Sequence, residues 1–147
     1  DNISLDKTIG KAKFTYNSGQ MIQAGVLLYQ TTSDETFLQD AQNTAKGAYK
    51  HFLNKRTGID GKDAYFYPAN PWFNVILLRG LLALAEVDNN YEYVNTMADN
   101  APYAWQNTRD ENGFLGNDWA GTKNKKFKWL LDNACMIELF AEINNIQ

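Results

Sequence analysis

The most apolar part of the chain is residues 70–87, NPWFNVILLRGLLALAEV. It opens with Asn70-Pro71, an N-cap followed by proline at the first helical position, where the missing N–H of proline costs nothing. Apolar side chains then occupy nearly every side of the predicted helix, and such a helix lies inside a protein. The stretch therefore predicts a buried helix over residues 71–87.

Four further segments have helical periodicity. Residues 17–30 and 127–143 are apolar on most sides, which predicts that they are buried as well. Residues 37–53 and 91–105 each carry one apolar stripe, which predicts two amphipathic helices that face water on their other side.

Some details of these helices can also be predicted. Thr32 and Glu35 have the spacing of a capping box that would open the first amphipathic helix. Pro102 is expected to kink the second amphipathic helix. Trp105 and Trp129 lie on helical stripes and are expected in the core.

The predicted helices alternate between the buried and the amphipathic type. The buried helices begin near Asn17, Pro71 and Phe127, which are 54 and 56 residues apart, so the chain repeats a helical-hairpin unit. Long irregular segments, 54–70 and 109–126, follow the amphipathic helices. In an up-and-down arrangement, the long loops and the N-termini of the buried helices are therefore expected at one end.

This pattern predicts an all-α fold, either an α/α-toroid or a helical solenoid, with an inner and an outer layer of helices. A closed toroid of six such hairpins would have about 330 residues. The chain has 147 residues and nearly three hairpins. We therefore expect about half of a ring, as one partial domain over residues 1–147.

Composition limits the possible chemistry. The formal net charge is −3, which argues against a nucleic-acid partner, and no apolar run reaches the ~18 residues of a membrane span. One histidine, His51, and one cysteine, Cys135, argue against a zinc site, a disulfide and a Ser-His-Asp triad. We predict no cofactor and no metal, so any chemistry falls to carboxylate, amide and aromatic groups.

Several motifs resemble those of glycoside hydrolase family 76, the bacterial and fungal endo-α-1,6-mannanases. Tyr16-Asn17-Ser18-Gly19 is similar to the family's Tyr-Asn-Gln-Gly segment, and residues 73–79 are similar to its Phe-Lys-Gly-Ile-Phe-Val-Arg stretch. The closing loop of the family is matched by residues 105–110, Gly113-Phe114 and Asp118-Trp119. The resemblance runs in order from about residue 14 to residue 143.

The resemblance implies an (α/α)6 barrel, a mannan-type substrate, export from the cytoplasm and a catalytic pair of adjacent aspartates in the N-terminal half of the domain. This chain has no Asp-Asp pair, so it resembles the C-terminal half and is expected to be inactive alone. Asn74 and Val75 replace the family's Lys and Gly, which is a departure in the region of the glycan cleft.

The candidate substrate-binding residues combine rings, on which a sugar can stack, with amide and carboxylate groups that bind its hydroxyls. They are Tyr16, Asn17, Trp72, Asn74, Asp118 and Trp119. Each has a structural alternative: aromatic residues near helix ends can cap the core, Asn17 can be an N-cap, and Asp118 can close a turn. We assign no catalytic residue and no metal ligand in this chain.

Two other carboxylates of the predicted loop end, Asp60 and Asp110, stand close to glycines and are interpreted first as turn residues.

The leading functional hypothesis is a fragment of a glycoside hydrolase acting on α-mannan-type polysaccharide, which supplies part of the cleft but not the catalytic pair. The alternatives are a noncatalytic α-helical module that binds a glycan or a protein, and a helical scaffold for assembly. A half-ring leaves apolar surface at its edges. Its expected partners are therefore the polysaccharide and either a missing N-terminal half or a second copy.

Overall fold

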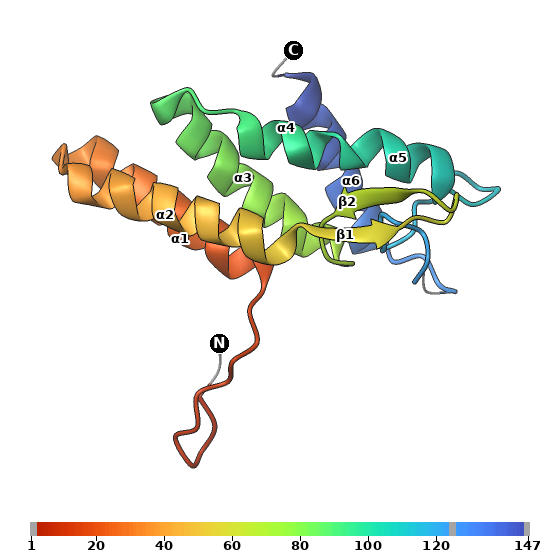
Figure 1. The fold of residues 1–147 in the computed structure, drawn as a ribbon, viewed down its shortest axis with the longest axis horizontal. Helices are drawn as coiled ribbons and strands as arrows, with labels where there is room; N and C mark the ends of the chain where they lie inside the picture. The colour runs from red at the N-terminus through yellow and green to blue at the C-terminus, as the bar shows by residue number, and fades with distance from the viewer. Residues whose placement is uncertain (1–2, 124–125, 146–147) are drawn as a thin grey trace.

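The computed structural model describes residues 3–123 and 126–145 (Figure 1). Its helices and strands, in chain order, are α1 (Thr15–Thr32), α2 (Glu35–Phe52), β1 (Asn54–Thr57), β2 (Asp63–Phe66), α3 (Pro71–Asp88), α4 (Glu92–Ala98), α5 (Asn100–Asn107) and α6 (Leu130–Asn144). Each segment predicted to be helical contains a helix.

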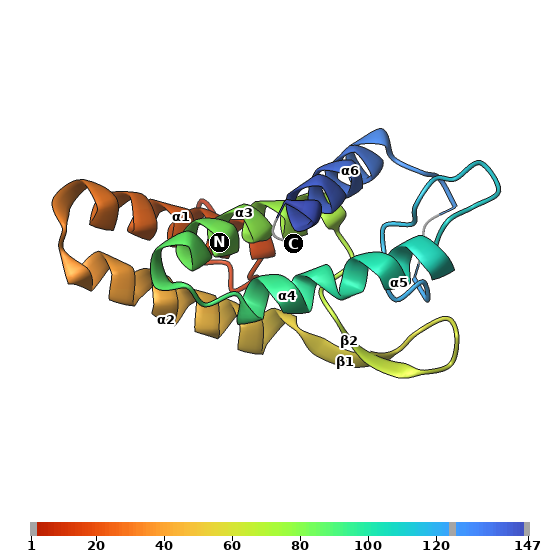
Figure 2. The ribbon, with the colours of Figure 1, turned by 90° about the horizontal axis from the view of Figure 1, so that it is seen from above.

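The helices form two layers, which Figure 2 shows from above. Helices α1, α3 and α6 lie in the inner layer, and α2, α4 and α5 lie in the outer layer. The short α1–α2 and α3–α4 links lie at one end of the molecule, whereas the β1–β2 hairpin and the long α5–α6 segment lie at the other. The predicted alternation of layers and the gathering of long loops at one end are confirmed.

Helix α3 is the centre of the core. Leu77 and Leu78 have no exposed surface, and they pack in the same buried cluster as Ile22 of α1 and Leu139 of α6. Because α3 has α1 on one side and α6 on the other, half of its 18 residues are buried. The prediction that residues 71–87 form a buried helix is confirmed.

Helices α1 and α3 cross at two glycines. A Cβ atom on Gly19 would lie 2.3 Å from the carbonyl oxygen of Ile76, and one on Gly80 would lie 2.4 Å from the carbonyl oxygen of Gly19. These neighbours are backbone atoms of packed helices and cannot move aside easily. The crossing therefore packs the beginning of α1 closely against the middle of α3.

The start of α2 corrects the predicted capping box. The N-cap is Asp34, whose carboxylate accepts hydrogen bonds from the backbone N–H of Thr36 at 2.9 Å and from its hydroxyl at 2.7 Å. These bonds favour the charged form and lower the pKa of Asp34. Thr32 instead donates its hydroxyl to the carbonyl of Leu28, back along α1.

The predicted fourth helix is broken rather than kinked at its proline. Helix α4 ends at Ala98 and α5 begins at Asn100, so the break falls at Asp99 and not at Pro102. Pro102 has no N–H for the carbonyl of Ala98, four residues earlier, and its ring clashes with that carbonyl. The interruption therefore lies one turn before the proline.

The β1–β2 hairpin was not predicted, since residues 54–70 were expected to be irregular. The two strands pair antiparallel, from Asn54 opposite Phe66 to Thr57 opposite Asp63. Gly61, in the connecting turn, has φ +78°, a conformation that favours glycine.

Helices α1 and α6 each leave an apolar face exposed. The large side chains on these faces are Met21, Leu27 and Leu28 of α1 and Leu130, Leu131 and Ile137 of α6. Ile137 is 72% exposed and Leu130 is 78% exposed, although both belong to a segment predicted to be buried. No helix in residues 3–123 or 126–145 is both long enough and apolar enough to cross a membrane.

Trp105 and Trp129 are 45% and 47% exposed, so the prediction that they lie in the core is wrong for the described chain. Trp105 lies on the outer helix α5. The guanidinium of Arg109 stands 4.0 Å from the centre of its ring, and Phe140 of α6 meets that ring edge-on. The stripe that carries Trp105 thus reaches the surface at this end of α5.

Candidate functional site

Aromatic side chains gather where α1 and α3 begin. The rings of Phe14, Tyr16 and Trp72 are nearly parallel: Phe14 lies 5.8 Å from Tyr16 at 16°, and Tyr16 lies 6.2 Å from Trp72 at 11°. Phe73 supports them, with its ring centre 4.5 Å from that of Tyr16. We call Phe14, Tyr16 and Trp72 the aromatic row.

The aromatic row is partly open to solvent. Phe14 is 36% exposed, and Tyr16 and Trp72 are half-buried. A shallow cavity of about 240 Å³ lies beside it, lined among others by Phe14, Asn70 and Phe73. The row therefore offers ring surface to a ligand while its other contacts hold the rings in place.

Asn74 holds the two helix starts together. It is completely buried, accepts a hydrogen bond from the Thr15 hydroxyl at 3.0 Å and donates its amide N–H to the carbonyl of Pro68 at 2.8 Å. Both ends of its amide are thus used within the chain, and its side chain has no surface for a sugar. Asn74 thus positions the residues around it, and its assignment as a substrate-binding residue stays a prediction.

Asn17 lies in the first turn of α1, at the same end as the aromatic row. The N-cap of α1 is Phe14, two residues before Tyr16, so the alternative interpretation of Asn17 as an N-cap does not hold. Asn17 is half-buried, and it lies one residue after Tyr16 of the aromatic row.

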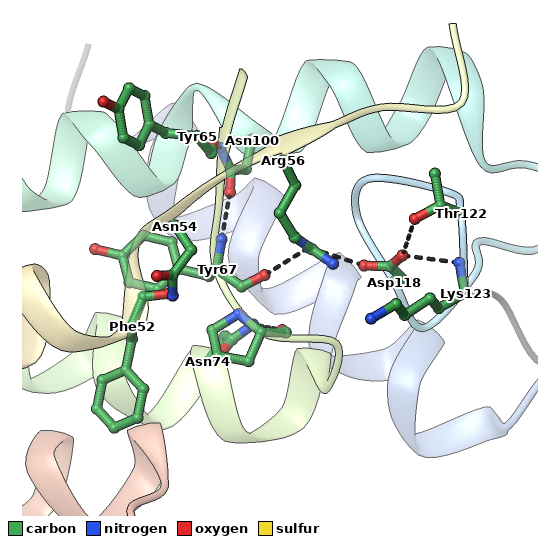
Figure 3. Close-up of polar contacts among 11 residues, drawn as sticks. Phe52, Asn54, Arg56, Tyr65, Tyr67, Asn74, Asn100, Asp118, Thr122 and Lys123 are labelled. Carbon is green, nitrogen blue, oxygen red and sulfur yellow. Dashed lines mark hydrogen bonds and ion pairs between the residues drawn. The ribbon is translucent and has the colours of Figure 1, made fainter. Parts of the chain in front are cut away.

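Asp118 is completely buried and forms an ion pair with Arg56 of β1, at 3.0 Å from Oδ1 to Nη2 (Figure 3). The same Arg56 nitrogen donates to the carbonyl of Tyr67 at 3.1 Å. The other Asp118 oxygen accepts from the Lys123 backbone N–H at 3.0 Å and the Thr122 hydroxyl at 3.3 Å. Asp118 therefore ties the α5–α6 segment to the hairpin, and its role in this chain is structural.

Trp119 is also buried, with 1% of its surface exposed. Its indole N–H donates to the sulfur of Met136 on α6 at 3.1 Å, and Tyr67 meets its ring edge-on. Trp119 therefore lies in the core, as the structural alternative for this residue predicted. Trp119, like Asn74 and Asp118, supports the loop end from within.

Two exposed carboxylates of the loop end, Asp60 and Asp63, have local partners. Asp60 accepts a 2.6 Å hydrogen bond from the Tyr103 hydroxyl, which is the main reason that its pKa is lowered. Asp63 accepts from the Thr57 hydroxyl and pairs with Lys55, and both contacts lower its pKa.

Asp110 accepts hydrogen bonds from the backbone N–H groups of Asn112 and Phe114, as a turn residue does. In the part of the chain that the structure describes, no group of three or more His, Cys, Asp or Glu side chains could hold a metal ion.

Sequence reasoning missed three residues of this region. Phe14 and Phe73 complete and support the aromatic row, and their positions beside Tyr16 and Trp72 were the available signal. Arg56 had no signal, because its partner Asp118 is 62 residues away along the chain.

The geometry can thus bind the apolar face of a flat ligand. Residues 1–145 match the sequence profile of glycosyl hydrolase family 76. The chain belongs to this family. Comparison with curated proteins gives no match.

Solved structures of family 76 proteins have the same fold. A family 76 glycoside hydrolase from a bovine strain of Bacteroides thetaiotaomicron is 24% identical, with a TM-score of 0.84 over 99% of this chain. A second one from Bacteroides thetaiotaomicron, described as a mannosidase, is 27% identical, with a TM-score of 0.80 over 92% of this chain. This chain thus has the predicted architecture, that of an all-α toroid, over the part of the fold that it contains.

Only part of that family 76 fold is present in this chain. The match covers 33% of the first of these solved chains and 37% of the second. The inner helices α1, α3 and α6, with the outer helices that accompany them, therefore form an arc of the toroid. The chain therefore holds only part of the family 76 fold, and its assignment to the C-terminal half of the domain stays a prediction.

Proposed function

We propose that this chain is part of a glycoside hydrolase that acts on α-mannan-type polysaccharide, and that its aromatic row lines the glycan cleft. The row supports this proposal most strongly: three nearly parallel rings stand at the beginnings of two inner helices. The solved relative described as a mannosidase, 27% identical, favours mannan as the polysaccharide.

The contribution of the row is binding and positioning. The apolar face of a pyranose packs against a flat ring, and Asn17 brings an amide to the same end for its hydroxyls. Of the six candidate residues, Tyr16, Asn17 and Trp72 remain in the proposed substrate-binding surface. Asn74, Asp118 and Trp119 hold this end of the fold from inside.

Catalysis needs two carboxyl groups on either side of the scissile bond. The sequence has no Asp-Asp pair like the one that the family resemblance implies, and the loop carboxylates Asp60, Asp63 and Asp110 are used in local contacts. We therefore place the catalytic pair in another part of the protein and expect this chain alone to be inactive.

The open faces of α1 and α6 support the same proposal. Apolar side chains such as Leu28 and Leu130 would be covered by further helices of the ring. We propose that the remaining, N-terminal half of the domain supplies these helices, and that a second copy covers the faces when that half is absent. A polysaccharide substrate also implies an extracytoplasmic location for the protein.

The test is hydrolysis of an α-1,6-linked mannan by the full natural protein that contains this chain. Trp72→Ala should lower kcat/KM by about tenfold or more, because it removes the tryptophan ring at one end of the aromatic row. Trp105→Ala is the control, since it removes a partly exposed tryptophan from the outer layer, away from the aromatic row, and it should leave kcat/KM unchanged. Equal activity of the two variants, or hydrolysis by residues 1–147 alone, would overturn the proposal.

A further inference from the structure

A cavity of about 570 Å³ lies in the outer layer, between the C-terminal end of α2, the β1–β2 hairpin and the α4–α5 junction. This volume is within the ~300–1,000 Å³ that small-molecule sites usually have. The cavity shares no lining residue with the aromatic row, which lies at the beginnings of α1 and α3.

Three tyrosines from three different elements line this cavity. Tyr49 comes from α2, Tyr65 from β2 and Tyr103 from α5. Tyr65 is 57% exposed, so a face of its ring is available, whereas Tyr103 packs edge-on against Phe66 and donates its hydroxyl to Asp60. The cavity therefore combines a solvent-exposed ring with rings that the fold holds in place.

Asn100 fixes the strand that carries Tyr65 (Figure 3). It is buried, and its amide N–H donates to the carbonyl of Tyr65 at 2.9 Å while its oxygen accepts from the N–H of Tyr67 at 3.2 Å. These two bonds join α5 to β2 across the floor of the cavity. The position of Tyr65 is thus set before any ligand arrives, which lowers the entropy lost on binding.

Two charged side chains line the same cavity from opposite walls. Lys50 projects from α2, and Asp99 lies at the junction of α4 and α5. Within residues 3–123 and 126–145, neither the Lys50 ammonium nor the Asp99 carboxylate has a hydrogen-bond or ion-pair partner. One cation and one anion give the cavity a donor and an acceptor without a net charge.

We propose that this cavity, which we call the outer tyrosine pocket, is a second glycan-binding site that takes a neutral oligosaccharide. An anionic ligand would be repelled by Asp99 and a cationic ligand by Lys50, whereas a neutral sugar can place its hydroxyls on both side chains and its apolar face on Tyr65. The choice of mannan as the glycan rests on the proposed function, and the choice of a neutral sugar rests on the pocket itself.

The pocket is tested by affinity electrophoresis of the protein in gels containing α-1,6-mannan, dextran or no polymer. Tyr65→Ala should weaken retardation by a neutral glycan about three- to tenfold, the loss of one ring contact. Tyr29→Ala, a tyrosine at the far end of α1, is the matched control and should change nothing. The loss from Tyr65→Ala should persist in a Trp72→Ala background, because the two sites are separate.

The outcomes separate this proposal from the proposed function. If Trp72→Ala abolishes mannan retardation and Tyr65→Ala has no effect, the outer tyrosine pocket is overturned and the cleft assignment stands. If Tyr65→Ala weakens retardation by dextran and mannan does not bind, the pocket stands and the mannan assignment fails. If neither polymer retards the unsubstituted protein, the pocket proposal is overturned.

Discussion

Helices α3 and α6 have similar apolar sequences and different surroundings. Nine of the 18 residues of α3 are buried, whereas α6 buries only Asp132, Met136 and Leu139 among its 15. Helix α3 lies between two inner neighbours, and α6 has such a neighbour on one side within the described chain. A sequence that is apolar on all sides of a helix thus indicates that the helix needs neighbours on all sides. It does not show that those neighbours belong to the same chain.

The strongest test of this difference compares the same substitution on the two helices. Leu77→Ala on α3 should lower the free energy of unfolding by about 2–5 kcal/mol, because it leaves a cavity around a completely buried side chain. Leu130→Ala on α6 should lower it by less than about 0.5 kcal/mol, because Leu130 is 78% exposed. Urea denaturation measures both, and equal losses would mean that α6 is covered.

The crossing of α1 and α3 should be the next most sensitive feature. Gly19→Ala should destabilise the protein by about 1–3 kcal/mol, since the new Cβ would meet the Ile76 carbonyl at 2.3 Å. Gly47→Ala on α2 is the matched control: nothing lies within 4 Å of its Cβ position, so it should stabilise the helix by about 1 kcal/mol. Thermal unfolding of the two variants should shift in opposite directions, and a shared direction would contradict the crossing.

The segment leading to α6 depends on Asp118. Asp118→Ala should cost about 1–3 kcal/mol, because it leaves the Arg56 guanidinium and two other donors without their acceptor. Asp63→Ala, which removes an exposed carboxylate with an ion pair of its own, should leave the unfolding midpoint nearly unchanged. If Asp118→Ala weakened mannan binding with no loss of stability, the structural role assigned to Asp118 would be wrong.

The smallest effect is expected where α3 meets α6 at the surface. Arg79 pairs with Glu138 through two hydrogen bonds, the second at 2.8 Å, and the pairing raises the pKa of Arg79. A double-mutant cycle with Arg79→Met and Glu138→Gln should give a coupling of about 0.2–1 kcal/mol that falls in ~1 M salt. A coupling that does not change with salt would indicate that this edge of α3 and α6 is shielded from water.

Much of the fold could be predicted from the sequence. Periodicity located the helices, and Asn70-Pro71 marked the beginning of α3, because these signals act over one or two turns. Prediction failed where contacts between distant parts decide the structure. The β1–β2 hairpin is held in part by Asn100 from α5, and Trp129 and Ile137 are exposed because the described residues do not cover them.

The candidate site was predicted less completely for the same reason. Aromatic residues near helix beginnings pointed to Tyr16 and Trp72, whose exposure follows from their place on the first turn. Asp118 and Trp119 are residue types that commonly bind sugars, but here both are buried. Arg56 pairs with Asp118 and Met136 accepts from Trp119, and each comes from another element. Residue type indicates what a side chain can bind, and packing decides whether a ligand reaches it.

The most direct test of the arc is the accessibility of its edges in the full natural protein that contains this chain. Leu130→Cys and Leu28→Cys, each in a Cys135→Ser background, would be labelled with a maleimide under native conditions, with Gln39→Cys on the exposed face of α2 as the reference. If further helices complete the ring, both edge cysteines should react more slowly than the reference by about tenfold or more. Labelling of both edges as fast as the reference would contradict the account.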